Sequence, residues 1–220
     1  RKRAAQEILR LKDELTRHVT DKYHALFDGM DQGFALLEVL FDATGAQAVD
    51  FRYLELNPGF VRESGMPEGA QGRTARELLP ELDPFWFDTY GRVARTGETT
   101  RVEHYVPQVD RWFDVHAFRL GPPEARQVAV LFTNITARKW AEERQAFLLA
   151  LSDAVRPLSD AGAIWLTSAQ VLGRFLGACR VAYAEDGGDG ETFIAAPNYV
   201  DGVPDVVGRY RYADFGAGME

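Results

Sequence analysis

The chain has 220 residues, 46% of them hydrophobic and 26% charged, which is the composition of an ordinary globular protein. Its net charge of -8 disfavours nucleic acid and anionic membranes as partners, because both attract basic proteins. The lone Cys179 excludes an internal disulfide and a cysteine-rich metal site, and no apolar run is long enough to cross a bilayer. We therefore expect a cytoplasmic protein and, because the chain begins at Arg1, a longer parent.

The first predicted element is an amphipathic helix over residues 1–20, followed by a second short helix over residues 21–30. Ile8, Leu11 and Leu15 form an apolar stripe with charges around it. This stripe fits a helix packed on its own domain, and it fits equally well a coiled coil with a second copy of the chain. Both interpretations stay open at this point.

The middle of the chain alternates between strand patterns and turn residues. Asn57-Pro58 starts a helix after the second strand, with Asn as the N-cap and Pro in the first turn, and Gly65 ends it. The predicted strands are residues 33–42, 48–56, 99–106, 111–120 and 127–135, and the other helices are residues 74–79 and 84–95. This order predicts an α+β fold: a five-stranded antiparallel sheet with short helices on one face.

A long charged helix over residues 137–158 follows the last strand. Thr136 is a good N-cap for it, since its hydroxyl can accept from free backbone N–H groups of the first turn. Leu148, Leu151 and Val155 fall at heptad spacing, which favours pairing of this helix in a dimer. Beyond it we predict a helix over residues 160–176, strands over 179–185 and 191–199, a Gly/Pro-rich end over 201–218, and a buried thiol at Cys179.

Residues 21–136 resemble a PAS domain of the sensor histidine kinase type. The resemblance is carried by residues 23–27, 33–34, 56–60, 72–74, 86–87, 97–98, 111–115 and 134–139. The last of these is similar to the Asp-Ile-Thr exit sequence of the family, with Asn134 in place of Asp. Residues 159–220 look like the start of a GAF domain, so residues 1–20 and 137–158 become flanking helices that act in dimerisation and signalling.

The resemblance implies a small-molecule cavity between the sheet and the short helices. By alternation and alignment, the residues expected to face it are Trp86, Tyr90, His104, Asp114, His116, Phe118, Val130 and Phe132. Polar groups in an apolar shell are typical of specific small-molecule sites. The alternative is a filled core in which the polar groups satisfy one another.

The resemblance also allows cofactors to be considered. LOV-type flavin chemistry needs a cysteine early in the third helix, and residues 57–65 contain none. Haem of the oxygen-sensing PAS type needs an axial histidine on the long helix, and residues 84–95 contain none. We expect neither flavin nor haem, and the identity of any other cofactor stays open. No catalytic triad, phosphate loop or metal-ligand spacing is present in the sequence.

The functional hypothesis is a sensory and dimerisation module of a bacterial signalling protein, the PAS–GAF input region of a histidine kinase. This chain would itself be non-catalytic, forming a homodimer that passes a signal through Asn134, Thr136 and Arg138 to a C-terminal output domain. Three alternatives are carried with it: a ligand-free dimerisation scaffold, the input region of a diguanylate cyclase, phosphodiesterase or other output enzyme, and an enzyme that uses His104, Asp114 and His116.

Overall fold

The chain divides into two compact units, Arg1–Lys139 and Trp140–Glu220, hereafter unit 1 and unit 2. The computed structural model describes the backbone of residues 2–66 and 69–215, and the side chains of residues 10–12, 14–66 and 69–214. The predicted domain boundaries at residues 20, 136 and 158 remain predictions.

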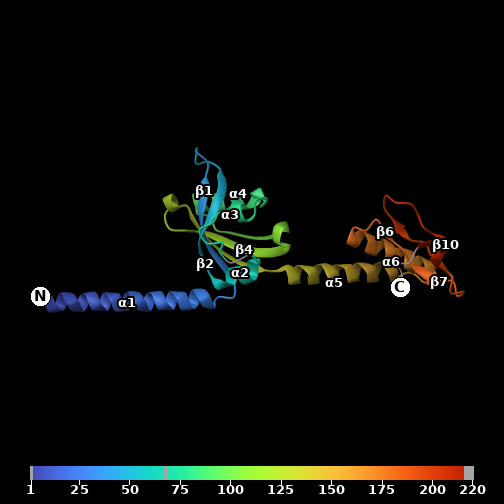
Figure 1. Ribbon diagram of the computed structural model, residues 1–220, viewed down its shortest axis with the longest axis horizontal. Coiled ribbons are helices and arrows are strands. Elements are labelled where there is room, and N and C mark those ends of the chain that lie inside the picture. Colours follow the sequence, from blue (N-terminus) through green and yellow to red (C-terminus); the bar gives the residue numbers. More distant parts are fainter. Residues whose placement is uncertain (1, 67–68, 216–220) are drawn as a thin grey trace. The chain divides into compact units, whose positions relative to one another are not determined.

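Unit 1 is built on one five-stranded antiparallel sheet (Figure 1). Its strands are β1 (Gly33–Phe41), β2 (Ala48–Leu56), β3 (Thr100–Val106), β4 (Arg111–Leu120) and β5 (Gln127–Asn134). The order across the sheet is β2-β1-β5-β4-β3, so the first and last strands lie side by side at its centre. The predicted α+β class and the five-strand sheet are confirmed, and the arrangement is consistent with a PAS fold.

Four helices belong to this unit: α1 (Lys2–Gly29), α2 (Pro58–Ser64), α3 (Ala75–Leu78) and α4 (Pro84–Thr96). Single-turn 3-10 helices lie at Pro107–Val109 and Pro123–Ala125. The prediction of two separate helices before residue 30 is wrong, since α1 runs through as one helix. No Gly or Pro interrupts residues 2–28, so nothing breaks its hydrogen-bond ladder there.

The core lies on the face of the sheet that is covered by α2 and α4. Along β1, for example, Ala35, Leu37 and Val39 are buried while the residues between them are partly exposed. This is the period-two pattern of a strand with one face in the core. Helix α4 meets the same core with Trp86, Tyr90 and Val93, because residues three and four apart share one helix face.

Asn57 joins three segments at one edge of this core. Its side chain is 2% exposed, and its Oδ1 accepts from the backbone N–H groups of Phe34 (2.8 Å) and Phe60 (2.9 Å). Its Nδ2 donates to the carbonyl oxygens of Gln32 (2.9 Å) and Phe27 (3.3 Å). The predicted N-cap of α2 therefore also ties down the end of α1 and the start of β1.

Unit 2 holds most of α5 (Thr136–Val155), α6 (Ala161–Leu176) and five short strands. Sheet β10-β8-β7 is formed by Gly208–Arg211, Thr192–Ala195 and Ala184–Asp186, and β6 (Arg180–Val181) pairs with β9 (Tyr199–Val200). A 3-10 turn, Tyr212–Phe215, follows. Each strand predicted over 179–185 and 191–199 is in fact two, and β10 lies in a stretch predicted to be irregular. Pro197 explains one break, because it cannot donate to a ladder.

Aromatic contacts hold unit 2 together. The ring of Tyr199 on β9 covers Gly173 of α6, where even a Cβ atom would lie only 2.1 Å from that ring. Phe147 stacks on Phe175 with 4.5 Å between ring centroids, which joins α5 to α6. Cys179 is exposed, so the prediction of a buried thiol is wrong.

Candidate functional site

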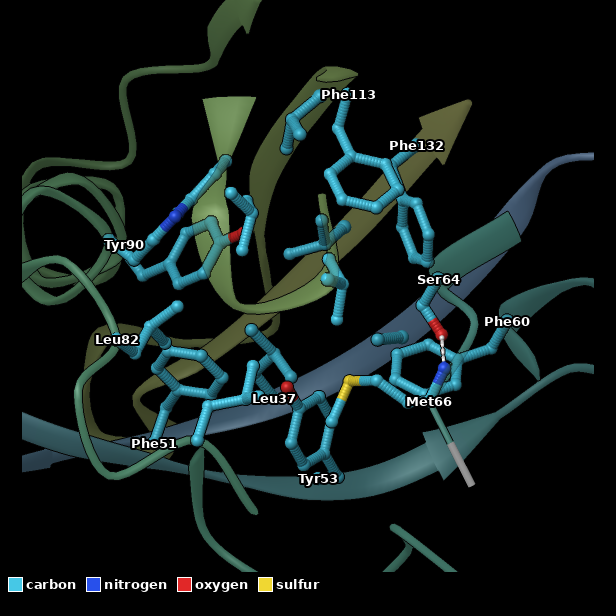
Figure 2. Close-up of a pocket in the computed structure, with 17 residues that line it drawn as sticks. Leu37, Phe51, Tyr53, Phe60, Ser64, Met66, Leu82, Tyr90, Phe113 and Phe132 are labelled. Atoms are coloured by element: carbon cyan, nitrogen blue, oxygen red, sulfur yellow. Dashed lines mark hydrogen bonds between the residues drawn. The ribbon is translucent and has the colours of Figure 1, made fainter. Parts of the chain in front are cut away.

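A cavity of about 90 Å³ lies between the sheet and helices α2 and α4 of unit 1 (Figure 2). Its wall is almost entirely apolar and aromatic. The described residues that line it are Ala35, Leu37, Phe51, Tyr53, Phe60, Ser64, Met66, Leu79, Leu82, Trp86, Tyr90, Val106, Val109, Phe113, Val115, Val130 and Phe132. An apolar pocket with a few polar groups is the usual form of a small-molecule site.

Local sequence signals place the helical part of this wall. Asp83 caps α4 by accepting from the Phe85 N–H at 2.9 Å, and Pro84 occupies the first turn, where its missing donor costs nothing. Gly97 ends the helix in the left-handed conformation at φ 77°. With its ends fixed in this way, α4 presents Trp86 and Tyr90, one turn apart, to the sheet.

Four polar side chains interrupt the apolar wall: Ser64, Tyr53, Tyr90 and Trp86. The Ser64 hydroxyl accepts from the Met66 N–H at 3.1 Å. Burial raises the pKa of Tyr53, with a smaller contribution from the Asp50 charge, and burial likewise raises the pKa of Tyr90 well above its usual value. Both phenols therefore stay protonated and can donate. Among the described lining residues none carries an ionised side chain.

Four of the residues predicted to face the cavity do line it: Trp86, Tyr90, Val130 and Phe132. His104 lies on the helix-covered face but outside the lining. Its ring stacks on Phe85 at 4.2 Å between centroids and meets Trp86 edge-on at 5.2 Å. The His104 Nε2 is 3.5 Å from a carboxylate oxygen of Asp83, so this histidine contacts the N-cap residue of α4.

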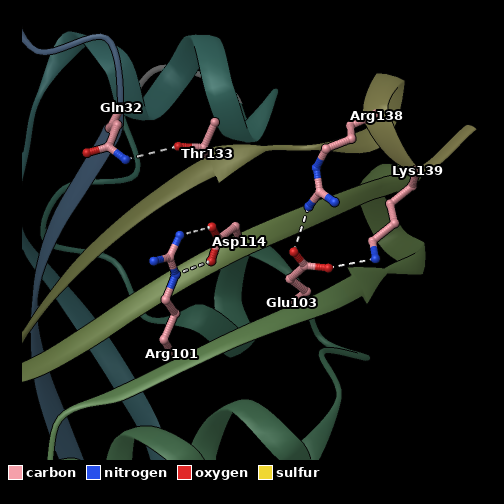
Figure 3. A network of polar contacts seen from close by, with 7 residues as sticks. All are labelled: Gln32, Arg101, Glu103, Asp114, Thr133, Arg138 and Lys139. Atoms are coloured by element: carbon pink, nitrogen blue, oxygen red, sulfur yellow. Dashed lines mark hydrogen bonds and ion pairs between the residues drawn. The ribbon is translucent and has the colours of Figure 1, made fainter. Parts of the chain in front are cut away.

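The predicted inward orientation of Asp114, His116 and Phe118 is wrong. Phe113, Val115 and Ala117 are the buried residues of β4, so the residues between them point to the opposite face. Asp114 instead pairs with Arg101 on β3, at 2.6 and 3.0 Å (Figure 3), and this guanidinium holds the pKa of the Asp114 carboxyl below its usual range. An inward Asp114 would place an unpaired carboxylate in the apolar core, which is far more costly.

The strand-to-helix junction is a small hydrogen-bonded cluster. Asn134 Oδ1 accepts from the backbone N–H of Thr136 at 3.0 Å and from its hydroxyl at 2.6 Å. The Thr136 Oγ1 in turn accepts from the backbone N–H of Trp112 on β4 at 2.9 Å. The Asn134 N–H donates to Glu63 of α2 at 2.6 Å. Thr136 thus bonds across to β4 and fastens the start of α5 to the sheet. This corrects its predicted N-cap role, because Thr136 is the first residue of α5 and its hydroxyl accepts from Trp112 of β4, not from the first turn of the helix.

A pair of cations at the start of α5 makes a second attachment. Glu103 of β3 accepts from Arg138 and from Lys139, each at 2.6 Å (Figure 3). Lys139 and then Arg138 are the main causes of the lowered pKa of Glu103. Gln32 bonds to the Thr133 hydroxyl of β5 at 3.2 Å on the same face. The contacts of Glu103 are exposed, so they hold the first turn of α5 against β3 more than they stabilise the unit.

Sequence reasoning missed Phe113 and Val115 as cavity residues and Glu63 as a junction residue. The first two could have been found from the alternation of β4, because Phe113, Val115 and Ala117 form its one unbroken apolar set. Glu63 carries no such signal, since its partner Asn134 lies 71 positions away in the sequence.

The residues predicted to form dimer helices divide into three groups. Leu11 and Leu15 of α1 are 58% and 65% exposed, and Leu148 of α5 is 51% exposed. Leu151 and Val155 are half-buried. The side chain of Ile8 lies outside the described residues.

Two searches of the described residues bear on other kinds of site. Within them, no group of three or more His, Cys, Asp or Glu side chains could hold a metal ion. Among the described helices, none combines the length and apolar character that a membrane crossing requires.

No protein-family model and no curated protein sequence matches the chain. Among solved structures, it is similar to the PAS domain of an HTR-like protein from Haloarcula marismortui, with 18% identity and a TM-score of 0.42 over 57% of this chain and 99% of that one. It is similar to a Rhodobacter sphaeroides LOV protein, with 20% identity and a TM-score of 0.37 over 74% and 83% of the two chains. A blue-light activated histidine kinase from Erythrobacter litoralis has 14% identity and a TM-score of 0.36, over 70% of this chain and 58% of that one.

Proposed function

We propose that unit 1 is a signal-sensing input module whose cavity binds a small molecule and whose junction passes the state of the cavity to α5. The observation that carries this proposal is that two elements of the cavity wall continue into the junction. Phe132 lines the cavity on β5, and Asn134 follows it on the same face of the strand. A ligand can shift an equilibrium only through contacts that differ between two states, and these elements supply such contacts.

The second connection runs through α2. Phe60 and Ser64 of this helix line the cavity. Glu63, which directly precedes Ser64, accepts a hydrogen bond from the Asn134 N–H. Movement of α2 or of β5 would therefore alter the same cluster at Asn134 and Thr136. Glu103, which holds Arg138 and Lys139, then determines how the first turn of α5 responds. Interfaces of this kind have discrete alternative packings, which suits a switch.

The finer parts of the proposal concern the whole protein. We place this chain in a cytoplasmic histidine kinase, with unit 2 as the beginning of a GAF domain and a C-terminal output domain beyond it. The chain would be non-catalytic and homodimeric. The input region of a cyclase, a phosphodiesterase or another output enzyme is the alternative for the parent, and a ligand-free scaffold is the alternative for the module. His104 lies on the helix-covered face of the sheet, whereas Asp114 and His116 lie on the opposite face, so the three residues do not form one site for the enzyme hypothesis.

Dimerisation can be tested on α5. Replacing Leu148 and Leu151 together with serine should weaken the homodimer at least tenfold, because each buried leucine contributes about 1.5–3 kcal/mol. Sedimentation velocity across a concentration series measures this change. Leu149→Ser is the matched control, since Leu149 is equally exposed but lies off the heptad positions. A double variant that dimerises like the unsubstituted chain would contradict pairing through α5.

A further inference from the structure

Three hydrogen-bond donors project from the cavity wall without an acceptor. They are the hydroxyls of Tyr53 and Tyr90 and the indole N–H of Trp86, whose side chains belong to residues only 6%, 6% and 4% exposed. None of them bonds to any residue that the structure describes, whereas Ser64 beside them is bonded to Met66. Buried tyrosines and tryptophans usually find a partner, and a donor left without one is costly.

The three donors lie close to one another. Trp86 and Tyr90 lie one turn apart on α4, with 5.6 Å between their ring centroids. The ring of Phe51 packs edge-on against both Tyr53 and Tyr90, at 5.5 and 5.2 Å, and so spaces the two phenols. Figure 2 shows Tyr90 entering the pocket from α4 and Tyr53 entering it from β2.

The charge and size of the cavity further limit which molecules can bind in it. No ionised side chain lies among the described lining residues, so an ionic ligand would be buried without a counter-charge, at severe cost. The pocket holds about 90 Å³ and is not fully enclosed. The ligand is therefore a small neutral molecule.

We propose that the cavity takes a small neutral molecule with an apolar body and one carbonyl oxygen, whose two lone pairs accept from Tyr90 and Trp86, the neighbouring donors on α4, while Tyr53 is a further donor on the β2 side of the cavity. This assignment rests on the proposed sensory function and names its ligand class. Leucine or phenylalanine could pack equally well at these positions. A ligand with an acceptor explains why the wall instead carries two phenols and an indole.

The experiment compares three probes of nearly equal shape on the full chain. Cyclopentanone has the acceptor, methylenecyclopentane replaces its oxygen with a CH₂ group, and cyclopentylammonium carries a charge. NMR titration should show cyclopentanone shifting the indole N–H signal of Trp86, identified with Trp86→Phe, and binding at least tenfold more tightly than methylenecyclopentane. Cyclopentylammonium should leave that signal unchanged. Equal or tighter binding of methylenecyclopentane, binding of the cation, or no binding of cyclopentanone would overturn the assignment.

Variants separate the donors from the packing. Tyr90→Phe should weaken cyclopentanone binding about two- to tenfold, the range of one lost hydrogen bond, without lowering the melting temperature of the ligand-free chain. Tyr105→Phe removes an exposed hydroxyl bonded to Asp110 and should leave binding unchanged. If Tyr90→Phe bound cyclopentanone as tightly as the unsubstituted chain, its hydroxyl would not be a ligand donor.

The same titration shows whether the ligand assignment or the proposed signal transmission to α5 has failed. If cyclopentanone binds but the amide signals of Trp112 and Asn134 do not respond, the ligand class stands and the relay to α5 fails. If cyclopentanone does not bind while filling the cavity by substitution still alters those amides, the relay stands and the ligand class fails.

Discussion

Replacing Asn57 with alanine should lower the free energy of unfolding of unit 1 by about 3–5 kcal/mol. The substitution removes the side-chain N-cap of α2 and leaves the N–H of Phe34 and the carbonyl of Gln32 without their partners, while the Phe60 N–H keeps only its 3.0 Å bond to the backbone carbonyl of residue 57. Asn57 is only 2% exposed, so water cannot replace those bonds without opening the structure. Urea unfolding followed by the NMR signals of unit 1 measures the loss.

Asp83→Ala is the matched control for this prediction. Asp83 also caps a helix, but it is half-exposed and accepts from one backbone N–H, that of Phe85. Its loss should cost about 1 kcal/mol, the usual value for an N-cap. Equal costs for the two variants would show that Asn57 acts as an ordinary cap and does not join three segments.

Replacing Phe132 with alanine should cost about 3–5 kcal/mol, the range for removing a buried phenylalanine ring. The ring is packed edge-on against Phe60 at 5.6 Å and against Phe113 at 5.5 Å. It also lies over Gly33 on β1, where a Cβ atom would come within 2.4 Å of the ring. The lost ring would extend the existing cavity, which the rigid sheet cannot close. Urea unfolding again gives the measurement.

Phe118→Ala provides the comparison on the other face of the sheet. Phe118 is half-buried on β4 and points away from the cavity, so we expect a cost of about 1 kcal/mol. This pair of variants also tests the orientation of β4. If Phe118→Ala were as costly as Phe132→Ala, the two residues would share the core face.

The strands and caps of unit 1 were predictable because each depends on residues close together in the sequence. Asn57-Pro58, Asp83-Pro84 and the glycines at 65 and 97 define helix ends through local hydrogen bonds and backbone conformation. The continuous α1 was not predicted, since residues 1–20 and 21–30 were expected to form two helices although no Gly or Pro separates them. Unit 2 was less predictable, since its strands have two to four residues and little periodicity.

The cavity was predictable only in part. Trp86, Tyr90 and Phe132 followed from the resemblance to PAS domains, and Val130 from its alternation with Phe132 on β5. The orientation of β4 was missed because a shift of one residue exchanges the two faces of a strand, and the polar residues at 114 and 116 were assigned to the inside. In the structure, Phe113, Val115 and Ala117 determine which face of β4 packs in the core. Burying these three residues removes more apolar surface from water than burying the face that carries Asp114 and His116 would.

If the state of the cavity reaches the junction before α5, filling the cavity should change amide hydrogen exchange at that junction. Ala35→Leu fills the cavity from β1 and substitutes no residue of β5, α2 or the junction. We expect the amides of Trp112 and Asn134 to exchange at least about fivefold faster, since overpacking a core costs about 1–3 kcal/mol and would act on Phe60 and Phe132. The Gln47 amide, in the turn between β1 and β2, should keep its rate. Altered exchange at the cavity wall, for example at Tyr53, with unchanged rates at Trp112 and Asn134 would contradict the claim.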